Sequence, residues 1–255
     1  MKVRGPIAAA GLSTLMVAAC GGGDGMMTSS SMPTPASDPP MNSNPGNPMP
    51  GPMGPMNPMG PMSVPGEAAL GAFLQTRHET LLHGVDGAAA MVVNSPSARH
   101  GTFYGVGPAY AATRTLSVRG ADQQVTTRAT TRYFLANPYM PLGKVGADGR
   151  PFGVVTVSFG FPTTLTAGDS GPLDHLTYFH DALRQVAEGS EMTTYTVEAR
   201  GAASLRVCLR STVSEVTPQG LSDGLAPGTE SECYAVNASG AAALESVSTG
   251  DLALR

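Results

Sequence analysis

The feature that most limits how this chain folds is a low-complexity tract at residues 21–65. The tract holds 12 Pro and nine Met among many Gly, Ser and Asn, and its charged residues are Asp24 and Asp38. A segment of this composition lacks the apolar surface needed to offset the entropy lost on ordering. We therefore predict a disordered Pro/Met/Gly-rich tether, followed by one folded domain at residues 66–255 that is long enough to bury a substantial core.

Near its end the tract repeats with Met at every third position, at Met53, Met56, Met59 and Met62. A polyproline II helix has three residues per turn, so these thioethers would share one edge. Thioethers are soft ligands that suit Cu(I), and a Met-rich tether that handles copper is therefore one alternative function. Neutral filler in a drifting repeat is the simpler interpretation. As a flexible coil, ~45 residues reach ~35–40 Å, which would lift the domain clear of a lipid surface.

Residues 1–19 precede the tract and have the composition of a secretory signal peptide. A basic start, Met1 to Gly5, leads into an apolar stretch of small residues that ends at Ala19. As a helix, ~14 such residues would extend ~21 Å, which is shorter than the ~30 Å hydrocarbon core of a bilayer. We predict an export signal rather than a transmembrane helix.

The signal segment ends in Val17-Ala18-Ala19-Cys20, which resembles the lipobox of bacterial lipoprotein precursors. The resemblance implies cleavage before Cys20, attachment of a diacylglyceryl group to its thiol, and a further acyl chain on the new amino terminus. Two or three chains make a stable anchor where one is marginal. With Gly21 after the cysteine, the sequence resembles the class of lipoproteins that are sorted to the outer membrane. The expected location is the bacterial cell envelope, at the outer membrane, with the membrane as partner through the lipid on Cys20.

The remaining sequence is dominated by short runs typical of β-strands. Residues 124–134 alternate, with Thr126, Arg128, Thr130 and Arg132 on one side of the predicted strand. The other predicted strands lie at 88–93, 114–118, 152–161, 193–199, 204–210, 233–237, 242–247 and 252–254, with turns at 137–138 and 146–149. Several short strands with turn punctuation predict a mainly β fold, an antiparallel sandwich or open barrel.

Two helices are predicted to pack on this sheet. Apolar residues recur at three-and-four spacing over residues 67–83, and Gly84 provides a stop. A second apolar stripe covers residues 173–186 and ends before Gly189. Pro172 stands near its start, and Ser170 or Asp169 could cap it.

Two cysteines remain besides the predicted lipidation site, Cys208 and Cys233. Both lie in predicted strands of a chain expected to be exported, where disulfides form and persist. We predict a Cys208–Cys233 disulfide; a free catalytic thiol is the alternative.

Two motifs come close to known catalytic patterns without matching them. His78 and His83 resemble a zinc-protease motif with one residue too many, and on a helix the i, i+5 spacing would turn them ~140° apart. His175 and His180 have the same spacing. The run around Ser170 resembles the nucleophile loop of chymotrypsin-like proteases but lacks a glycine, and no accompanying histidine signature is present.

Charge gives limited information about partners. Charged residues are 13% of the chain and the net charge is −4, so the basic face that nucleic-acid binding needs is not indicated. Residues 66–144 carry seven Lys and Arg against four acids, whereas residues 145–255 carry six against thirteen. The asymmetry fits a solvated surface, or an acidic face for a basic partner or a divalent cation.

The favoured function is a non-enzymatic, lipid-anchored envelope protein whose β-rich head serves binding, adhesion or envelope structure, with a protein or small ligand as partner. The alternatives are a hydrolase using Ser170 with a histidine, and a tether that handles Cu(I). No catalytic group, metal-ligand set or cofactor is predicted. The predicted domains are a leader at 1–19, a lipidated tether at 20–65 and a β-rich domain at 66–255.

Overall fold

The computed structural model describes residues 62–255, apart from 85–86, 121–122 and 251. The predicted leader, the lipidation site Cys20, the Met repeat up to Met59 and most of the predicted tether lie outside the described residues. The predicted domain boundary, before residue 66, falls between the first strand and the first helix. The last three residues of the predicted tether, Ser63–Pro65, form that strand.

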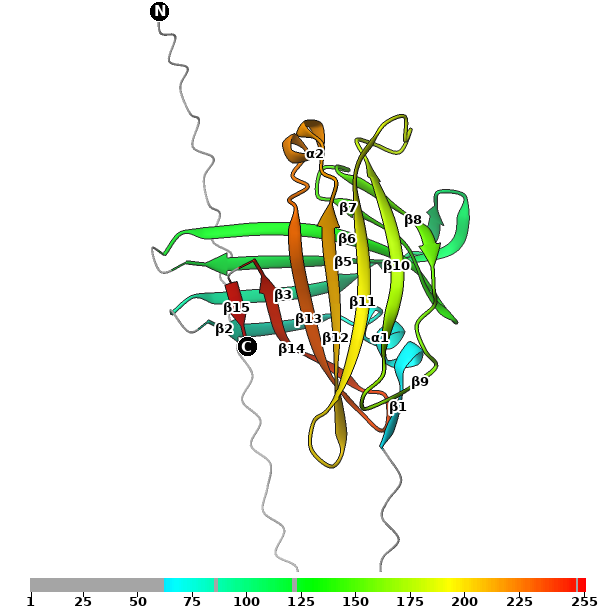
Figure 1. The fold of residues 1–255 in the computed structure, drawn as a ribbon, viewed down its shortest axis with the longest axis vertical. Helices are drawn as coiled ribbons and strands as arrows, with labels where there is room; N and C mark the ends of the chain where they lie inside the picture. The colour runs from blue at the N-terminus through cyan, green and yellow to red at the C-terminus, as the bar shows by residue number, and fades with distance from the viewer. Residues whose placement is uncertain (1–61, 85–86, 121–122, 251) are drawn as a thin grey trace, which may run out of the picture. The chain divides into compact units, whose positions relative to one another are not determined.

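The described residues form strands and two helices in the following order. They are β1 (Ser63–Pro65), α1 (Gly66–Leu74), β2 (His78–His83), β3 (Ala89–Pro96), β4 (Gly101–Phe103), β5 (Val106–Arg119), β6 (Val125–Ala136), β7 (Tyr139–Gly146), β8 (Phe152–Ser158), β9 (Thr164–Thr166), β10 (Ser170–Phe179), β11 (Ala187–Ala199), β12 (Ser204–Ser214), α2 (Pro218–Ser222), β13 (Gly228–Asn237), β14 (Ala242–Thr249) and β15 (Leu252–Leu254). Antiparallel pairing joins them in the order β15-β14-β13-β12-β11-β10-β8-β7-β6-β5-β3-β2, with β4 beside β5, while β1 pairs with β9 (Figure 1).

The two edges of the large sheet meet and nearly close it into a barrel. Gly84, after β2, forms a bridge with Leu254 of β15. The N–H of His83 donates to the carbonyl of Arg255 at 2.7 Å, and the N–H of Arg255 donates back at 3.0 Å. Closure pairs the backbone groups that free sheet edges leave unmatched. The predicted mainly β, antiparallel fold with two helices is confirmed, and its form is the barrel rather than the sandwich.

The first helix is shorter than predicted. It ends at Leu74, and residues His78–His83 form β2 instead. In β2 the side chain of Leu82 is buried while that of Leu81 is exposed, so this stretch follows the period of a strand. Pairing with β3 along its whole length overrides the local helical preference.

The second predicted helix is wrong, because residues Ser170–Phe179 form β10. Ser170 therefore begins a strand and caps no helix. The pairing register of β10 shifts between Pro172 and Asp174 on one side and between His175 and Leu176 on the other. The first of these shifts adds Leu173 to β10 and breaks its strict alternation, so the buried Leu173 and Leu176 acquire a three-residue spacing that imitates a helix. The second adds Thr156 to the partner strand β8.

The actual second helix, α2, is a single short turn of helix that the sequence reading missed. Thr217 caps it, its hydroxyl accepting a hydrogen bond from the N–H of Gly220 at 3.1 Å. Pro218 occupies the first turn, where its missing N–H costs nothing.

Helix α1 fills one end of the barrel interior. It contacts β3, β6, β7 and β14, which are far apart in the strand order. Its buried side chains Leu70, Phe73 and Leu74 belong to the largest apolar cluster. The buried Asn94 amide donates to the carbonyls of Leu74 at 3.2 Å and Thr76 at 2.8 Å, which matches groups left open at the helix end.

The disulfide is confirmed. Cys208 of β12 and Cys233 of β13 stand directly opposite each other, with their sulfur atoms 2.13 Å apart. This cross-link fixes the register of two central strands, so their inward side chains keep their places.

Candidate functional site

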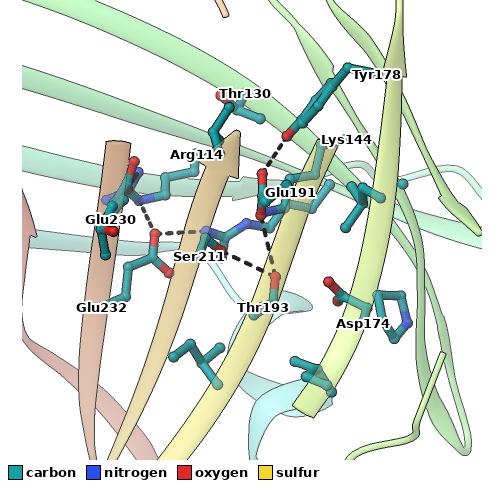
Figure 2. A pocket seen from close by; sticks show the side chains of 18 of the residues that line it. Arg114, Thr130, Lys144, Asp174, Tyr178, Glu191, Thr193, Ser211, Glu230 and Glu232 are labelled. Atoms are coloured by element: carbon teal, nitrogen blue, oxygen red, sulfur yellow. Dashed lines mark hydrogen bonds and ion pairs between the residues drawn. The ribbon is translucent and has the colours of Figure 1, made fainter. Parts of the chain in front are cut away.

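The inward faces of the strands change character along the barrel. Near α1 they carry buried apolar residues such as Val197, Leu205 and Val207. Toward the other end the same strands carry polar and charged residues, which surround a cavity of about 270 Å³. Its Arg, Lys, Asp and Glu lining consists of four bases, Arg114, Arg128, Arg132 and Lys144, and four acids, Asp174, Glu191, Glu230 and Glu232. Figure 2 labels Arg114, Lys144 and the four acids.

An arginine–glutamate network spans the cavity between β5, β6 and β13. Arg114 pairs with Glu230 through Nη1 at 2.7 Å and with Glu232 through Nε at 2.8 Å. Arg132 Nη2 lies 2.7 Å from the same Glu232 oxygen, and the Tyr234 hydroxyl donates to the other oxygen at 2.6 Å. Burial acts to raise the pKa of Glu232, but the two guanidinium groups outweigh it and hold that pKa well below its usual range.

A second charged group lies on β7, β10 and β11. Lys144 forms an ion pair with Glu191, and the Tyr178 hydroxyl donates to the other Glu191 oxygen at 2.5 Å (Figure 2). Thr193 adds a hydrogen bond to Glu191 at 3.3 Å. Burial acts to raise the pKa of Glu191, yet Lys144 and the hydrogen bonds from Tyr178 and Ser211 lower it to about 2. Glu191 is therefore a buried carboxylate that stays ionised.

Two side chains of the cavity have a buried polar atom without a hydrogen-bond partner among the described residues. Asp174 is 3% exposed, and its Oδ1 has no hydrogen-bond partner among the described residues. Burial raises the pKa of Asp174, which favours the neutral acid. The Nη2 group of Arg114 is buried and also lacks a partner within the described chain. Arg128 also lines the cavity but is exposed to solvent, and no ion pair with it occurs between the described residues.

Part of the wall is apolar and complements these charges. It is formed by side chains from α1 and three strands, β8, β10 and β12: Leu70, Val155, Leu173, Leu176, Leu209 and Val213. A cavity with apolar walls and a few convergent polar groups is the usual form of a small-molecule site. The arrangement suits a ligand with both an apolar body and a charged or polar head.

The candidate catalytic residues do not converge in the structure. Ser170 is exposed at the start of β10, and no hydrogen bond joins it to a histidine in the described part of the chain. His175 Nδ1 instead lies 3.1 Å from the Thr156 hydroxyl, and His83 lies at the seam where the barrel closes. His78 and His83 lie on one strand, β2, so the angle of ~140° expected between them on a helix does not describe their side chains.

Sequence reasoning missed the cavity, although one signal for it was visible. The sequence alternation predicts that Arg128, Thr130 and Arg132 lie on one side of a strand, and in the structure all three line the cavity. The partners of this face could not be found from the sequence, because Arg132 and Glu232 are 100 positions apart.

Comparison with protein-family models, curated proteins and solved structures finds no match to this chain. Neither helix in the described part of the chain has the length and hydrophobicity that crossing a bilayer requires.

Proposed function

We propose that this protein is a lipid-anchored binding protein of the bacterial cell envelope, whose barrel holds a small amphiphilic carboxylate in its charged cavity. The observation that carries the proposal is the set of unmatched polar atoms beside an open volume. Asp174 Oδ1 and Arg114 Nη2 are buried without partners next to about 270 Å³ of space.

Unmatched buried polar groups lower stability by ~1–3 kcal/mol each, and more when charged. Elsewhere in the cavity such groups are carefully paired, as Glu232 and Glu191 are. Sites where a chain departs from its own pattern at a cost are typically functional. A bound ligand that supplies the missing partners would offset that cost.

The charges favour an anionic head on the ligand. The cavity has equal numbers of bases and acids, and three of the acids are paired with Arg114, Arg132 and Lys144. Arg128 is the base with no ion pair among the described residues. Burial and Glu191 raise the pKa of the Tyr178 hydroxyl, and the charge of Arg128 acts against that rise, which places Arg128 near this end of the cavity. A carboxylate on Arg128, with its alkyl body against Leu173 and Leu176, satisfies both parts of the wall.

The anchoring part of the proposal rests on the lipobox resemblance at Val17–Cys20 and on the tether that follows it. The Cys208–Cys233 disulfide supports it, because disulfides persist in the oxidising compartments that exported proteins reach. Lipid on Cys20 would hold the barrel at the outer membrane while the tether leaves it free to move.

The ligand test compares molecules that share a body and differ in the head. The full chain carrying Cys20→Ser is titrated calorimetrically with octanoate, octanol and octylamine. Octanoate should bind ~10-fold or more tightly than octanol, since a hydrogen bond to a charged group contributes ~1.5–3 kcal/mol. Arg128→Ala should remove that preference. Arg119→Ala, at an exposed arginine outside the cavity lining, is the matched control and should preserve it. Equal binding of all three molecules, or no binding of octanoate, contradicts the carboxylate proposal.

The anchor test is metabolic labelling of expressing bacteria with a palmitate analogue. The wild-type chain should be labelled and should fractionate with membranes, whereas Cys20→Ser should be neither. Cys208→Ser/Cys233→Ser controls for thiols in general and should remain labelled. Labelling that persists in Cys20→Ser contradicts the anchoring proposal and leaves the ligand proposal untouched.

A further inference from the structure

A second cluster of titratable side chains lies outside the cavity, around α2. His180 follows β10, Glu188 is the second residue of β11, and Asp223 is the residue that ends α2. One ligating atom from each lies within 4.8 Å of the others. His180 Nδ1 is 2.5 Å from Asp223 Oδ2 and 3.6 Å from Glu188 Oε1.

An independent observation indicates that this cluster lacks a partner. The Glu188 residue is 1% exposed, and its Oε2 atom has no hydrogen-bond partner among the described residues. Burial raises the pKa of Glu188 and the neighbouring Asp223 raises it further, whereas His180 and Arg150 act to lower it. Two acids held together in a buried place, with one oxygen unmatched, are destabilising unless a positive group joins them.

We propose that His180, Glu188 and Asp223 bind a divalent transition-metal cation of the Zn²⁺ class. One imidazole nitrogen and two carboxylate oxygens form a ligand set that zinc accepts, whereas Mg²⁺ and Ca²⁺ favour oxygen alone. Three protein ligands leave a fourth position for water or an external ligand. A cation at this site would link the β10–β11 loop to α2, two segments that are far apart in the sequence.

The ligand atoms need only small movements to fit the cation. Tetrahedral zinc with bonds of ~2.0–2.2 Å sets its ligand atoms ~3.3–3.5 Å apart. Glu188 Oε1 is already 3.6 Å from His180 Nδ1. The His180–Asp223 contact must lengthen by ~1 Å, and the His180 side chain is 36% exposed and therefore free to turn.

The backbone around the cluster holds the ligands in place. The N–H of Thr217 donates to the Glu188 carbonyl at 2.8 Å, which fixes α2 against β11. A Cβ at Gly220 would lie 2.7 Å from that same carbonyl oxygen, so glycine permits this close approach. Gln219 donates to the second Asp223 oxygen at 3.2 Å and orients the carboxylate, as outer groups do in metal sites.

The test uses the full chain carrying Cys20→Ser, with Zn²⁺ alone as the probe in calorimetry and Co²⁺ as a spectroscopic reporter. Copper is avoided because of the Met-rich tether. One equivalent of Zn²⁺ should bind with a Kd below ~10 µM, and the melting temperature should rise by mass action. Co²⁺ should give the visible absorption of a low-coordinate site.

Glu188→Gln keeps the side-chain shape and removes its charge, and His180→Ala removes the nitrogen ligand. Each should weaken Zn²⁺ binding at least ~10-fold. His175→Ala and Glu198→Gln, which change a histidine and an acid outside the cluster, are the matched controls and should bind as the parent does. If Glu188→Gln fails to fold, as judged by circular dichroism, the partly exposed His180→Ala decides the matter. Absence of Zn²⁺ binding in the parent, or equal affinity in the His180 variant, overturns the proposal.

Discussion

The two ends of the barrel interior are built on the same strands and yet are opposite in chemistry. Down the inward face of β13 the residues change from Val236 and Tyr234 near α1 to Glu232 and Glu230 beside the cavity. β12 changes in the same way, from Leu205 and Val207 to Ser211. The apolar end needs no special explanation, because burying it stabilises the fold.

The charged end is different, because a buried ion network contributes little net stability. Desolvating Arg132 and Glu232 costs about as much as their attraction returns, and apolar side chains of similar volume would often serve as well or better. The apolar end therefore stabilises the fold, whereas the charged end contributes little net stability and is the part of the interior to which our proposal assigns ligand binding.

The largest expected effect comes from breaking the network at its centre. Glu232→Ala leaves Arg114 and Arg132 buried without a counter-charge, and should lower the free energy of unfolding by ~3–5 kcal/mol. Leu205→Ala at the apolar end should cost ~2–5 kcal/mol. Urea unfolding at pH 7 measures both, with the exposed Glu198→Ala as a control expected within ~0.5 kcal/mol of wild type. A loss of less than ~1 kcal/mol in the free energy of unfolding of Glu232→Ala would show that water solvates the network. That result would contradict the contrast between the apolar and charged ends of the barrel.

A second prediction concerns pH. The folded pKa of Glu191 is about 2, below the value of 4.5 for a free glutamate, so its ionisation stabilises the fold above pH 4.5. That contribution, about 3 kcal/mol, is lost as pH falls from 4.5 toward 2. The difference between wild type and Glu191→Gln should therefore be large at pH 7 and should shrink steadily below pH 4.5. Unfolding curves at several pH values measure this, and a difference that is constant with pH would contradict it.

The smallest expected effect has the opposite sign, in the same cavity. Burial raises the pKa of Asp174, so keeping it ionised at neutral pH destabilises the fold. Asp174→Asn should increase the free energy of unfolding slightly at pH 7, and the increase should vanish below the pKa of a free aspartate. If octanoate binds as proposed, the same variant reports whether the ligand contacts this residue. A loss of stability in Asp174→Asn at pH 7 would indicate a partner for the carboxylate and would remove one reason for the binding proposal.

The sequence predicts the class of fold well, because strand alternation and turn residues are local signals. The Cys208–Cys233 pair is also predictable, since no other cysteines remain once Cys20 is assigned to lipid. The failures have physical causes. A bulge at Leu173 gives β10 the apolar spacing of a helix, and pairing with β3 makes His78–His83 a strand where a helix was predicted.

Barrel closure and the site depend on contacts that are remote in sequence. The bridge between Gly84 and Leu254 decides barrel against sandwich, and it joins residues near opposite ends of the domain. The cation cluster is similar, since His180 and Asp223 are 43 positions apart and each is unremarkable alone. The alternation of the sequence shows that Arg128 and Arg132 lie on one face of a strand. It does not show which residues of other strands lie opposite that face.

The placement of β1 gives the barrel a direction. Pro65 of β1 packs beside Gly240, in the turn that follows β13, whereas α2 precedes the other end of that strand (Figure 1). Ten residues of β13 separate the two points by ~30 Å. The described chain therefore begins at one pole of the barrel, and the opposite pole, around α2, displays the exposed apolar side chains of Leu183, Val186 and Leu221.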